Sequence, residues 1–268
     1  MALNVLIVGS GICGPAFATL LQRSNPSHHI TVIERAASLR ATGLQLDFKA
    51  QGTPIIQALG LLDEMRKHSV EETGAEVVGP KGETLIRYGV LGNEAGSETT
   101  TLGLTRELEI MRGDIVKVLY ETSLSDREKI RKRGDNSGSL TYLFNTTLTS
   151  LLPTPTGTTV TFSSSPSSPP SHYDLVIGAD GQNSSTRVLA FGKPTSDASI
   201  TPLDAHVAYF RIPASRSDTS IAKFYLASKS RAIMLRNGGQ PQSQIYLFTT
   251  GAKAPVSPRA STAEQKGA

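Results

Sequence analysis

The chain has 268 residues, a length that fits one large domain or two modest ones, and about a quarter of them are Leu, Ile, Val or Phe, enough for a hydrophobic core. The net charge of +4 comes mostly from dispersed basic residues, so nucleic-acid binding has little support. No apolar run approaches the roughly 18 residues that cross a bilayer, which argues against a transmembrane helix and predicts a soluble chain.

The N-terminal segment carries the pattern of a strand, a glycine-rich turn, a helix and a second strand. Residues 3–8 form a short apolar run without alternation, which is typical of a strand buried on both faces of a parallel sheet. Apolar residues at helical spacing predict a helix over residues 15–23. Residues 30–33 predict a second buried strand, and Glu34 follows it. This order predicts one complete βαβ unit.

Helical and strand-like segments follow this unit. We expect helices over residues 55–65 and 110–120 and a hairpin over residues 75–88, with the first helix interrupted near Gly60. Residues 125–139 hold a run of cations, and we expect a solvated loop there because such charge runs usually face water. Further strands are expected over 142–144, 158–162 and 174–177, the last of them buried, and an antiparallel sheet over 206–212, 222–226, 232–235 and 245–249.

The turn Gly9-x-Gly11-x-x-Gly14 has the spacing of a dinucleotide-binding turn. Its backbone N–H groups would lie at the N-terminus of a helix, where unpaired donors and the positive end of the helix dipole attract a diphosphate. Gly9 permits the tight turn, Gly11 lets the diphosphate approach the backbone, and Gly14 lets helix and strand pack closely. We therefore predict a dinucleotide site; the alternative is a tight turn without a ligand.

Glu34 follows Gly14 by 20 residues, the spacing at which a carboxylate accepts hydrogen bonds from the adenosine ribose. A carboxylate at this position repels a 2′-phosphate, so NADP is disfavoured in this site, although the adjacent Arg35 offsets part of the charge. NAD and FAD both remain as candidate cofactors.

Three segments, in order between residue 1 and about residue 250, carry a more specific signal. They are VLIVGSGICGP at residues 5–15 with Glu34 and Arg35, MRGD at residues 111–114, and DLVIGADGQNSSTR at residues 174–187. Together they resemble the class A FAD-dependent aromatic monooxygenases, the p-hydroxybenzoate-hydroxylase-like and tetracycline-oxygenase-like family. The third segment resembles that family's second fingerprint and is not a general feature of dinucleotide-binding domains.

The resemblance implies FAD as the cofactor and NADPH or NADH as a transient reductant. On charge alone, a cation at a helix start is unfavourable, which favours a phosphate partner for Arg112 over solvent. Asp180 on its own would also fit an Asp-Gly turn after a strand. By resemblance, the ADP part is held by Gly9, Gly11, Gly14, Glu34 and Arg35, the phosphate side is reached by Arg112, the diphosphate segment contains Asp180 and Gly181, and the motif closes at Arg187.

The implied fold is α/β, a Rossmann-like FAD-binding βαβ domain with an inserted antiparallel substrate-binding sheet of α+β type. The FAD-binding domain would comprise residues 1–72 and 108–192, and the substrate sheet residues 73–107 and 193–268. The implied reaction is hydroxylation of an aromatic or polyketide-like small molecule by dioxygen, through a flavin C4a-hydroperoxide. The cofactor carries this chemistry, so no protein nucleophile is needed and the catalytic residues stay unknown.

The family's third fingerprint, a Gly-Asp segment whose Asp binds the flavin ribityl chain, has no counterpart in this sequence. Residues 251–268 resemble a polar linker within the family's substrate domain, so we expect the C-terminal part to be missing. Three explanations stay open: a truncated gene model, a partner encoded separately, and an impaired remnant that binds FAD or ADP. An NAD-dependent dehydrogenase with the same βαβ unit is a further alternative, although we find no candidate catalytic acid or base for it.

The single cysteine, Cys13, cannot form an internal disulfide, and with five scattered histidines it does not supply the spacings of a zinc site. We therefore expect a reducing, cytoplasmic location and no metal. Cys13 is expected to pack as a small hydrophobic residue within the turn. The expected partner is a small aromatic molecule, and no membrane or nucleic-acid partner is expected.

Overall fold

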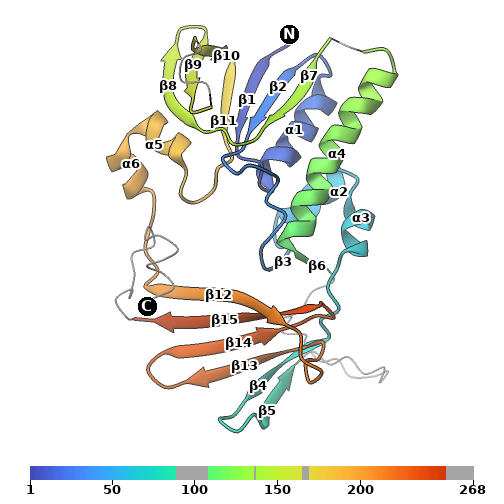
Figure 1. The fold of residues 1–268 in the computed structure, drawn as a ribbon, viewed down its shortest axis with the longest axis vertical. Coiled ribbons are helices and arrows are strands. Elements are labelled where there is room, and N and C mark those ends of the chain that lie inside the picture. The colour runs from blue at the N-terminus through green and yellow to red at the C-terminus, as the bar shows by residue number, and fades with distance from the viewer. Residues whose placement is uncertain (89–107, 136, 165–168, 252–268) are drawn as a thin grey trace. The chain divides into compact units, whose positions relative to one another are not determined.

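The computed structural model describes residues 1–88, 108–135, 137–164 and 169–251 (Figure 1). The chain divides into two compact units, and each is formed by two separate stretches of sequence. The first unit comprises Met1–His68 and Ile110–Ile200, and the second comprises Ser69–Glu109 and Thr201–Ala268. Residues 252–268, for which a linker was expected, lie outside the described part of the chain.

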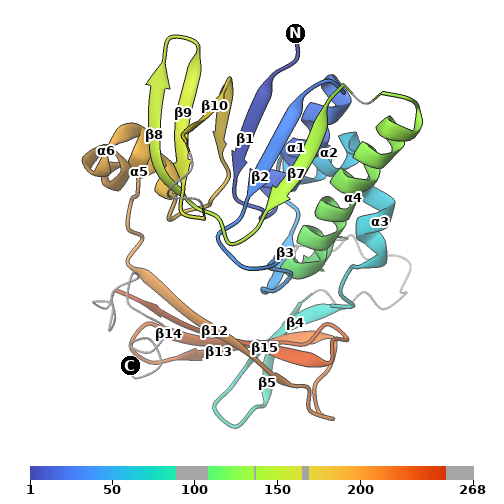
Figure 2. The same cartoon turned by 45° about the horizontal axis from the view of Figure 1, so that its top comes forward.

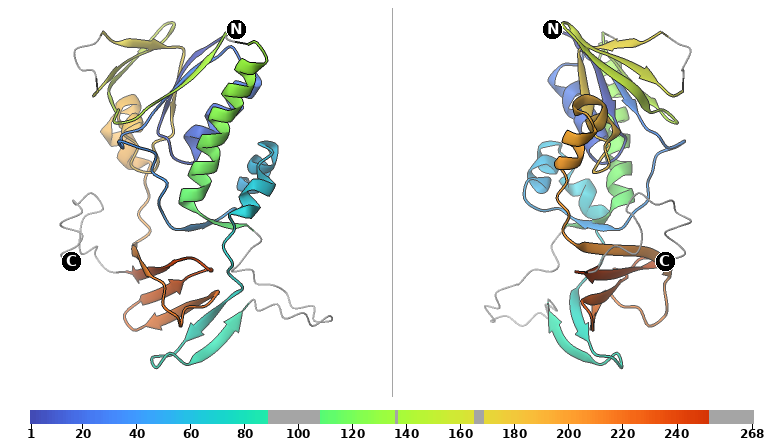
Figure 3. Two further views of the ribbon diagram at one scale, coloured as in Figure 1. Left: turned by 45° about the vertical axis from the view of Figure 1, so that its right-hand side comes forward. Right: turned by 90° about the vertical axis from the view of Figure 1, so that its left-hand side faces the viewer.

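A four-stranded parallel sheet in the order β11-β1-β2-β7 forms the centre of the first unit. Its strands are β1 (Asn4–Val8), β2 (His29–Ile33), β7 (Ser139–Leu143) and β11 (Leu175–Gly178). Helices α1 (Cys13–Ser24) and α4 (Arg112–Lys132) pack together and cover one face of the sheet (Figures 1 and 3). The predicted βαβ unit is therefore present as β1, α1 and β2.

The central strand β1 is buried on both faces. On the helix side, Val5 and Ile7 pack with Ala18 of α1. On the other side, Leu6 and Val8 pack against a three-stranded antiparallel sheet in the order β10-β9-β8 (Figure 3). Its strands are β8 (Leu148–Thr154), β9 (Gly157–Phe162) and β10 (Ser171–Tyr173). Burial on both faces is the reason for a continuous apolar run, so this prediction is confirmed.

Shorter elements complete the first unit. They are β3 (Gln45–Asp47), which pairs with β6 (Glu109–Met111), and the helices α2 (Gly52–Ala58), α3 (Leu62–Lys67), α5 (Ser185–Phe191) and α6 (Lys193–Ala198). The first residue of β6, Glu109, belongs to the second unit. The helix predicted over residues 55–65 is thus two helices, with Gly60 between them at a φ of +69°. Glycine adopts this left-handed conformation without the steric penalty of a side chain, so Gly60 ends the first helix and the predicted interruption is confirmed.

Helix α4 differs from its prediction at both ends. It starts at Arg112, because Ile110 lies in strand β6. It continues to Lys132, so the solvated loop expected from residue 125 is wrong. Lys129 lies 3.3 Å from Asp126, and Arg131 lies 2.9 Å from Glu128. Oppositely charged residues three positions apart meet on a helix surface, and these pairs stabilise the helix within a charge run that would otherwise favour a loop.

Two strand predictions for the first unit are also wrong. Strand β11 is not buried, and Leu175 is 40% exposed, because this strand lies at an edge of the sheet among the described residues. No strand was expected between residues 144 and 158, yet the segment around Pro153 is strand β8. β8 is an edge strand of its sheet, where a proline without an N–H donor is tolerated.

The second unit contains a six-stranded sheet in the order β12-β15-β14-β13-β4-β5 (Figure 2). Its strands are β4 (Gly74–Val78), β5 (Thr84–Tyr88), β12 (Ala205–Pro213), β13 (Ile221–Ala227), β14 (Arg231–Arg236) and β15 (Gln242–Thr250). The antiparallel sheet predicted over residues 206–249 is confirmed as β12, β15, β14 and β13, and the predicted hairpin as β4 and β5. The two parts join through β13 and β4, which run parallel. Helix α6, placed in the substrate segment 193–268, belongs instead to the first unit because it packs against α5.

A buried ion-pair cluster fixes one end of this sheet. Arg236 at the end of β14 pairs with Glu72 at 2.7 Å and with Glu109 at 2.6 Å. The Arg236 side chain is 14% exposed, and both carboxylates are more deeply buried.

In the described part of the chain, no helix is long and apolar enough to cross a membrane.

Candidate nucleotide site

The three glycines of the turn after β1 are required for different reasons. Gly9 has a φ of +109°, and a Cβ there would lie 2.5 Å from the carbonyl oxygen of Ala179. A Cβ on Gly14 would lie 2.0 Å from the carbonyl oxygen of Gly9, so helix and turn pack too closely for any side chain. A Cβ on Gly11 would meet only the Arg112 side chain, at 3.6 Å. Gly9 and Gly14 are therefore needed by the fold, whereas Gly11 leaves open space beside the backbone.

Helix α1 begins directly after this turn without a capping side chain. Ile12 occupies the N-cap position and makes no side-chain cap, and no acidic residue lies in the first turn. The first N–H groups of a helix have no partner within the helix. They remain available to a ligand at this end of α1, where the helix dipole favours negative charge.

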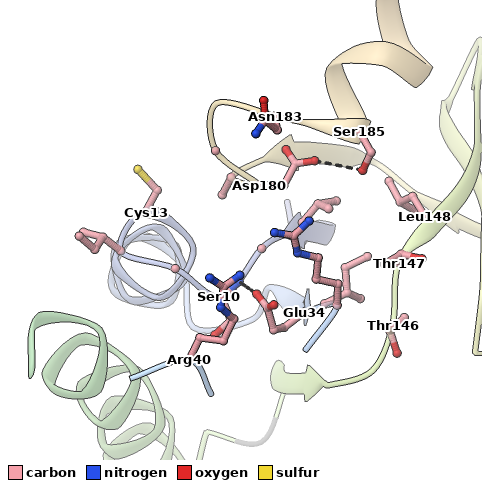
Figure 4. Close-up of a pocket in the computed structure, with 18 of the residues that line it drawn as sticks. Ser10, Cys13, Glu34, Arg40, Thr146, Thr147, Leu148, Asp180, Asn183 and Ser185 are labelled. Carbon is pink, nitrogen blue, oxygen red and sulfur yellow. Dashed lines mark hydrogen bonds between the residues drawn. The ribbon is translucent and has the colours of Figure 1, made fainter. Parts of the chain in front are cut away.

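A cavity of about 290 Å³ opens at this point (Figure 4). It lies at the carboxyl ends of β1, β2 and β11, the edge at which open α/β sheets bind ligands. Of the residues predicted to bind the cofactor, seven line it: Gly9, Gly11, Glu34, Arg35, Arg112, Asp180 and Gly181. Gly14 and Arg187 do not line it. Residues that the sequence did not single out also line it, among them Ser10, Arg40, Thr146, Thr147, Asn183 and Ser185.

Glu34 connects the end of β2 to the glycine turn. Its Oε2 accepts a hydrogen bond from the Ser10 N–H at 3.0 Å (Figure 4). Its Oε1 accepts one from the Ala36 N–H, also at 3.0 Å. An ionised carboxylate has about four lone-pair sites, so acceptor capacity remains for ribose hydroxyls. Beside it, the Ser10 Oγ is buried and has no hydrogen-bond partner among the described residues.

Arginines supply most of the charge around the cavity. Arg35 and Arg40 are exposed, and Arg112 at the start of α4 is partly buried. Among the described residues, the Arg112 guanidinium donates one hydrogen bond, from Nη1 to the Thr42 carbonyl at 3.0 Å. A guanidinium has five N–H donors, so most of its donors stay available. This arrangement suits a ligand with more than one negative charge.

Asp180 is held in the turn between β11 and α5. Its carboxylate accepts hydrogen bonds from the Ser184 hydroxyl at 2.5 Å, from the Thr186 N–H at 3.0 Å and from the Thr186 hydroxyl at 2.9 Å. Partial burial raises the pKa of Asp180, but these donors outweigh it and hold the pKa below its ordinary value. Asp180 lies in a bend shortly after β11, the turn itself falls at Gln182 and Asn183, and the Asp180 carboxylate anchors the start of α5.

Arg187 stabilises the segment between Asp180 and α5 by hydrogen bonds. Its Nη2 donates to the Gln182 carbonyl at 2.8 Å and its Nε to the Ser196 hydroxyl at 3.1 Å. Its backbone N–H donates to the capping Ser184 hydroxyl at 2.9 Å. Arg187 therefore joins the loop after Asp180 to α5 and α6 and lies away from the cavity lining.

Cys13 differs from its prediction. It is exposed and lines the cavity, because it is the first residue of α1 and precedes the residues that form the buried face of the helix (Figure 4). Among the described residues, no group of three or more His, Cys, Asp or Glu side chains could hold a metal ion.

Solved structures share this fold at low sequence identity. Tetracycline destructase Tet(51) matches with a TM-score of 0.71 at 21% identity, covering 100% of this chain and 61% of that one. CtdE in complex with FAD matches with a TM-score of 0.69 at 14% identity, covering 96% of this chain and 61% of that one. These likenesses show the fold alone.

Similarity to curated sequences is higher. FAD-dependent monooxygenase asL6 of Sarocladium schorii is 36% identical over 251 residues, which cover 92% of this chain and 57% of that protein. Flavin-dependent monooxygenase eupH of Phoma sp is 33% identical over 250 residues, which cover 92% of this chain and 54% of that protein. The chain thus spans a little over half the length of these relatives. The sequence pattern of the FAD binding domain matches residues 2–266, and the chain therefore belongs to the FAD binding domain family.

Proposed function

We propose that this chain functions as an FAD-dependent monooxygenase, which hydroxylates an aromatic or polyketide-like small molecule with dioxygen and with NADH or NADPH as reductant. Membership of the FAD binding domain family and the monooxygenase names of its relatives support this proposal. The structural observation that supports its nucleotide-binding part is the open backbone at Gly11, two residues before the uncapped start of α1 and beside Arg112.

The residues around the cavity fit the ADP half of FAD. The space that a side chain on Gly11 would fill lets a diphosphate approach the backbone N–H groups of the turn. Arg112 would donate to the same diphosphate, and Glu34 would accept from the ribose hydroxyls. Asp180 and Gly181 would border the diphosphate, Arg35 and Arg40 would contribute positive charge at the cavity lining, and Gly14 and Arg187 would act by fixing the backbone around it.

Bound FAD would supply the redox chemistry, passing two electrons from NADH or NADPH to dioxygen so that one oxygen atom enters the substrate and the other leaves as water. The part played by the described residues is binding and orientation. The Ser10 and Ala36 N–H groups hold the Glu34 carboxylate in one orientation, and the Thr42 carbonyl does the same for the Arg112 guanidinium. Groups fixed before binding lose less freedom when the ligand arrives, which increases affinity.

The variant Gly11→Val tests this assignment. A Cβ at Gly11 meets no backbone atom, so the fold should tolerate the change, while the branched side chain occupies the space needed by the diphosphate. We expect purified wild-type protein to be yellow after incubation with FAD and gel filtration, and the variant to be colourless with an unchanged circular dichroism spectrum. A wild type that stays colourless but titrates with NADH would favour the NAD-dependent dehydrogenase instead. FAD binding without oxidation of NADPH in the presence of candidate phenols would favour a remnant that only binds the nucleotide.

A further inference from the structure

The backbone of residues 41–44 runs so close to the start of α4 that glycines are needed where the two segments meet. The Arg112 N–H donates to the Leu44 carbonyl at 2.9 Å. A Cβ on Gly113 would lie 2.4 Å from the Ala41 carbonyl oxygen. A Cβ on Gly43 would lie 2.9 Å from the Arg112 Cδ and 3.0 Å from its Cβ. No side chain therefore fits between this segment and the first turn of α4.

The same segment determines where the Arg112 guanidinium lies. The aliphatic part of the side chain rests against Gly43, whose φ of +140° is a conformation that residues with a side chain rarely adopt. Beyond it, Nη1 donates to the Thr42 carbonyl at 3.0 Å, and Nη2 lies 3.6 Å from the Cβ position of Gly11. The guanidinium is thus held at its stem and at one nitrogen, next to the open side of the glycine turn.

A free arginine side chain samples many rotamers, and fixing it on binding costs free energy. A side chain fixed before the ligand arrives avoids that loss. We propose that residues 41–44 are a positioning element: Gly43 and the Thr42 carbonyl hold Arg112 toward the glycine turn and so set the affinity for the diphosphate. This inference rests on the proposed function, because it assumes that the diphosphate of FAD or ADP binds at this turn.

The variant Gly43→Ala tests the proposal, because its Cβ displaces the Arg112 side chain. We expect ADP affinity, measured by calorimetry, to fall about tenfold, the effect of one charge-assisted hydrogen bond, while adenosine affinity changes less than about twofold. Gly60→Ala is the matched control, since Gly60 also has a positive φ but nothing lies within 4 Å of its Cβ position. That variant should keep the wild-type ratio of ADP to adenosine affinity.

A second cycle separates positioning from general damage to the fold. In an Arg112→Ala background, Gly43→Ala should cause no further loss of ADP affinity, because the displaced side chain is absent. Equal losses of ADP and adenosine affinity, or additive losses in the double variant, would overturn the proposal and leave the proposed function intact. Absence of ADP binding by the wild type would instead refute the proposed function.

A measurement on the unliganded wild type does not depend on the variant folding. The heteronuclear NOE at the Arg112 Nε, assigned with Arg112→Ala, should approach that of the α4 backbone. Arg40, which is exposed and makes no hydrogen bond among the described residues, provides the mobile comparison. An Arg112 signal as mobile as that of Arg40 would overturn the proposal.

Discussion

Glu34 offers a sharp test because it has a structural and a proposed binding role at once. In Glu34→Gln the side chain keeps its shape, but one acceptor oxygen becomes an NH₂ donor that faces a backbone N–H, either that of Ser10 or that of Ala36. An unpaired buried N–H costs about 1–3 kcal/mol. For a chain of this size, that cost lowers Tm by roughly 2–4 °C per kcal/mol, so a loss of about 2–12 °C is expected.

Thermal melting followed by circular dichroism measures this loss. The matched control is Glu121→Gln, since Glu121 is 60% exposed and lies 4.0 Å from Lys117, where little stability is at stake. Calorimetry on the same samples should show that ADP and adenosine lose affinity by similar factors, because both ligands contain the ribose. A variant that melts with the control, or that weakens ADP binding but not adenosine binding, would refute this account of Glu34.

Three further predictions concern other groups. Hydrogen bonds from Ser184 and Thr186 hold the pKa of Asp180 below its ordinary value, so its contribution to stability is present at neutral pH and is lost as the pH falls through that lowered value. Urea titrations from pH 7 to pH 2 should therefore show a smaller acid-induced loss of unfolding free energy for Asp180→Asn than for the wild type. The same pH dependence in both proteins would contradict this. Arg236→Met removes the guanidinium that two buried carboxylates share, so unfolding of the second unit should become easier by about 3–5 kcal/mol, and a change below about 1 kcal/mol in urea denaturation would show that the cluster is not buried as described. Cys13 is the only cysteine, so its reaction with a chromogenic disulfide should slow several-fold with saturating ADP, whereas an unchanged rate would place the nucleotide elsewhere.

The parts of the fold that follow from local sequence were predictable. Strand β1, the glycine turn and α1 depend on residues next to one another in the chain, and the turn allows few alternatives at Gly9 and Gly14. Strand β11 was wrongly predicted to be buried. Its edge position depends on which strands pair with it, and the residues of the strand do not determine that. The end of α4 was missed because its ion pairs form only once the segment is already helical.

The candidate site shows the same division. Glycine spacing and an acid at the end of the second strand identified Glu34 and Gly11, because this motif is local. Arg40 and Thr147 belong to no motif and reach the cavity through the fold, so the sequence offered no signal for them. Arg187 was assigned through its motif, and its hydrogen bonds hold the loop after Asp180, so we expect it to support the site through the backbone.

The most direct test is a crystal structure of the chain grown with saturating ADP. We expect diphosphate density against the Gly11 backbone, within hydrogen-bond distance of Arg112, and ribose hydroxyls on the free lone pairs of Glu34. A well-ordered cavity without nucleotide, or ADP bound with its phosphates away from the start of α1, would contradict it.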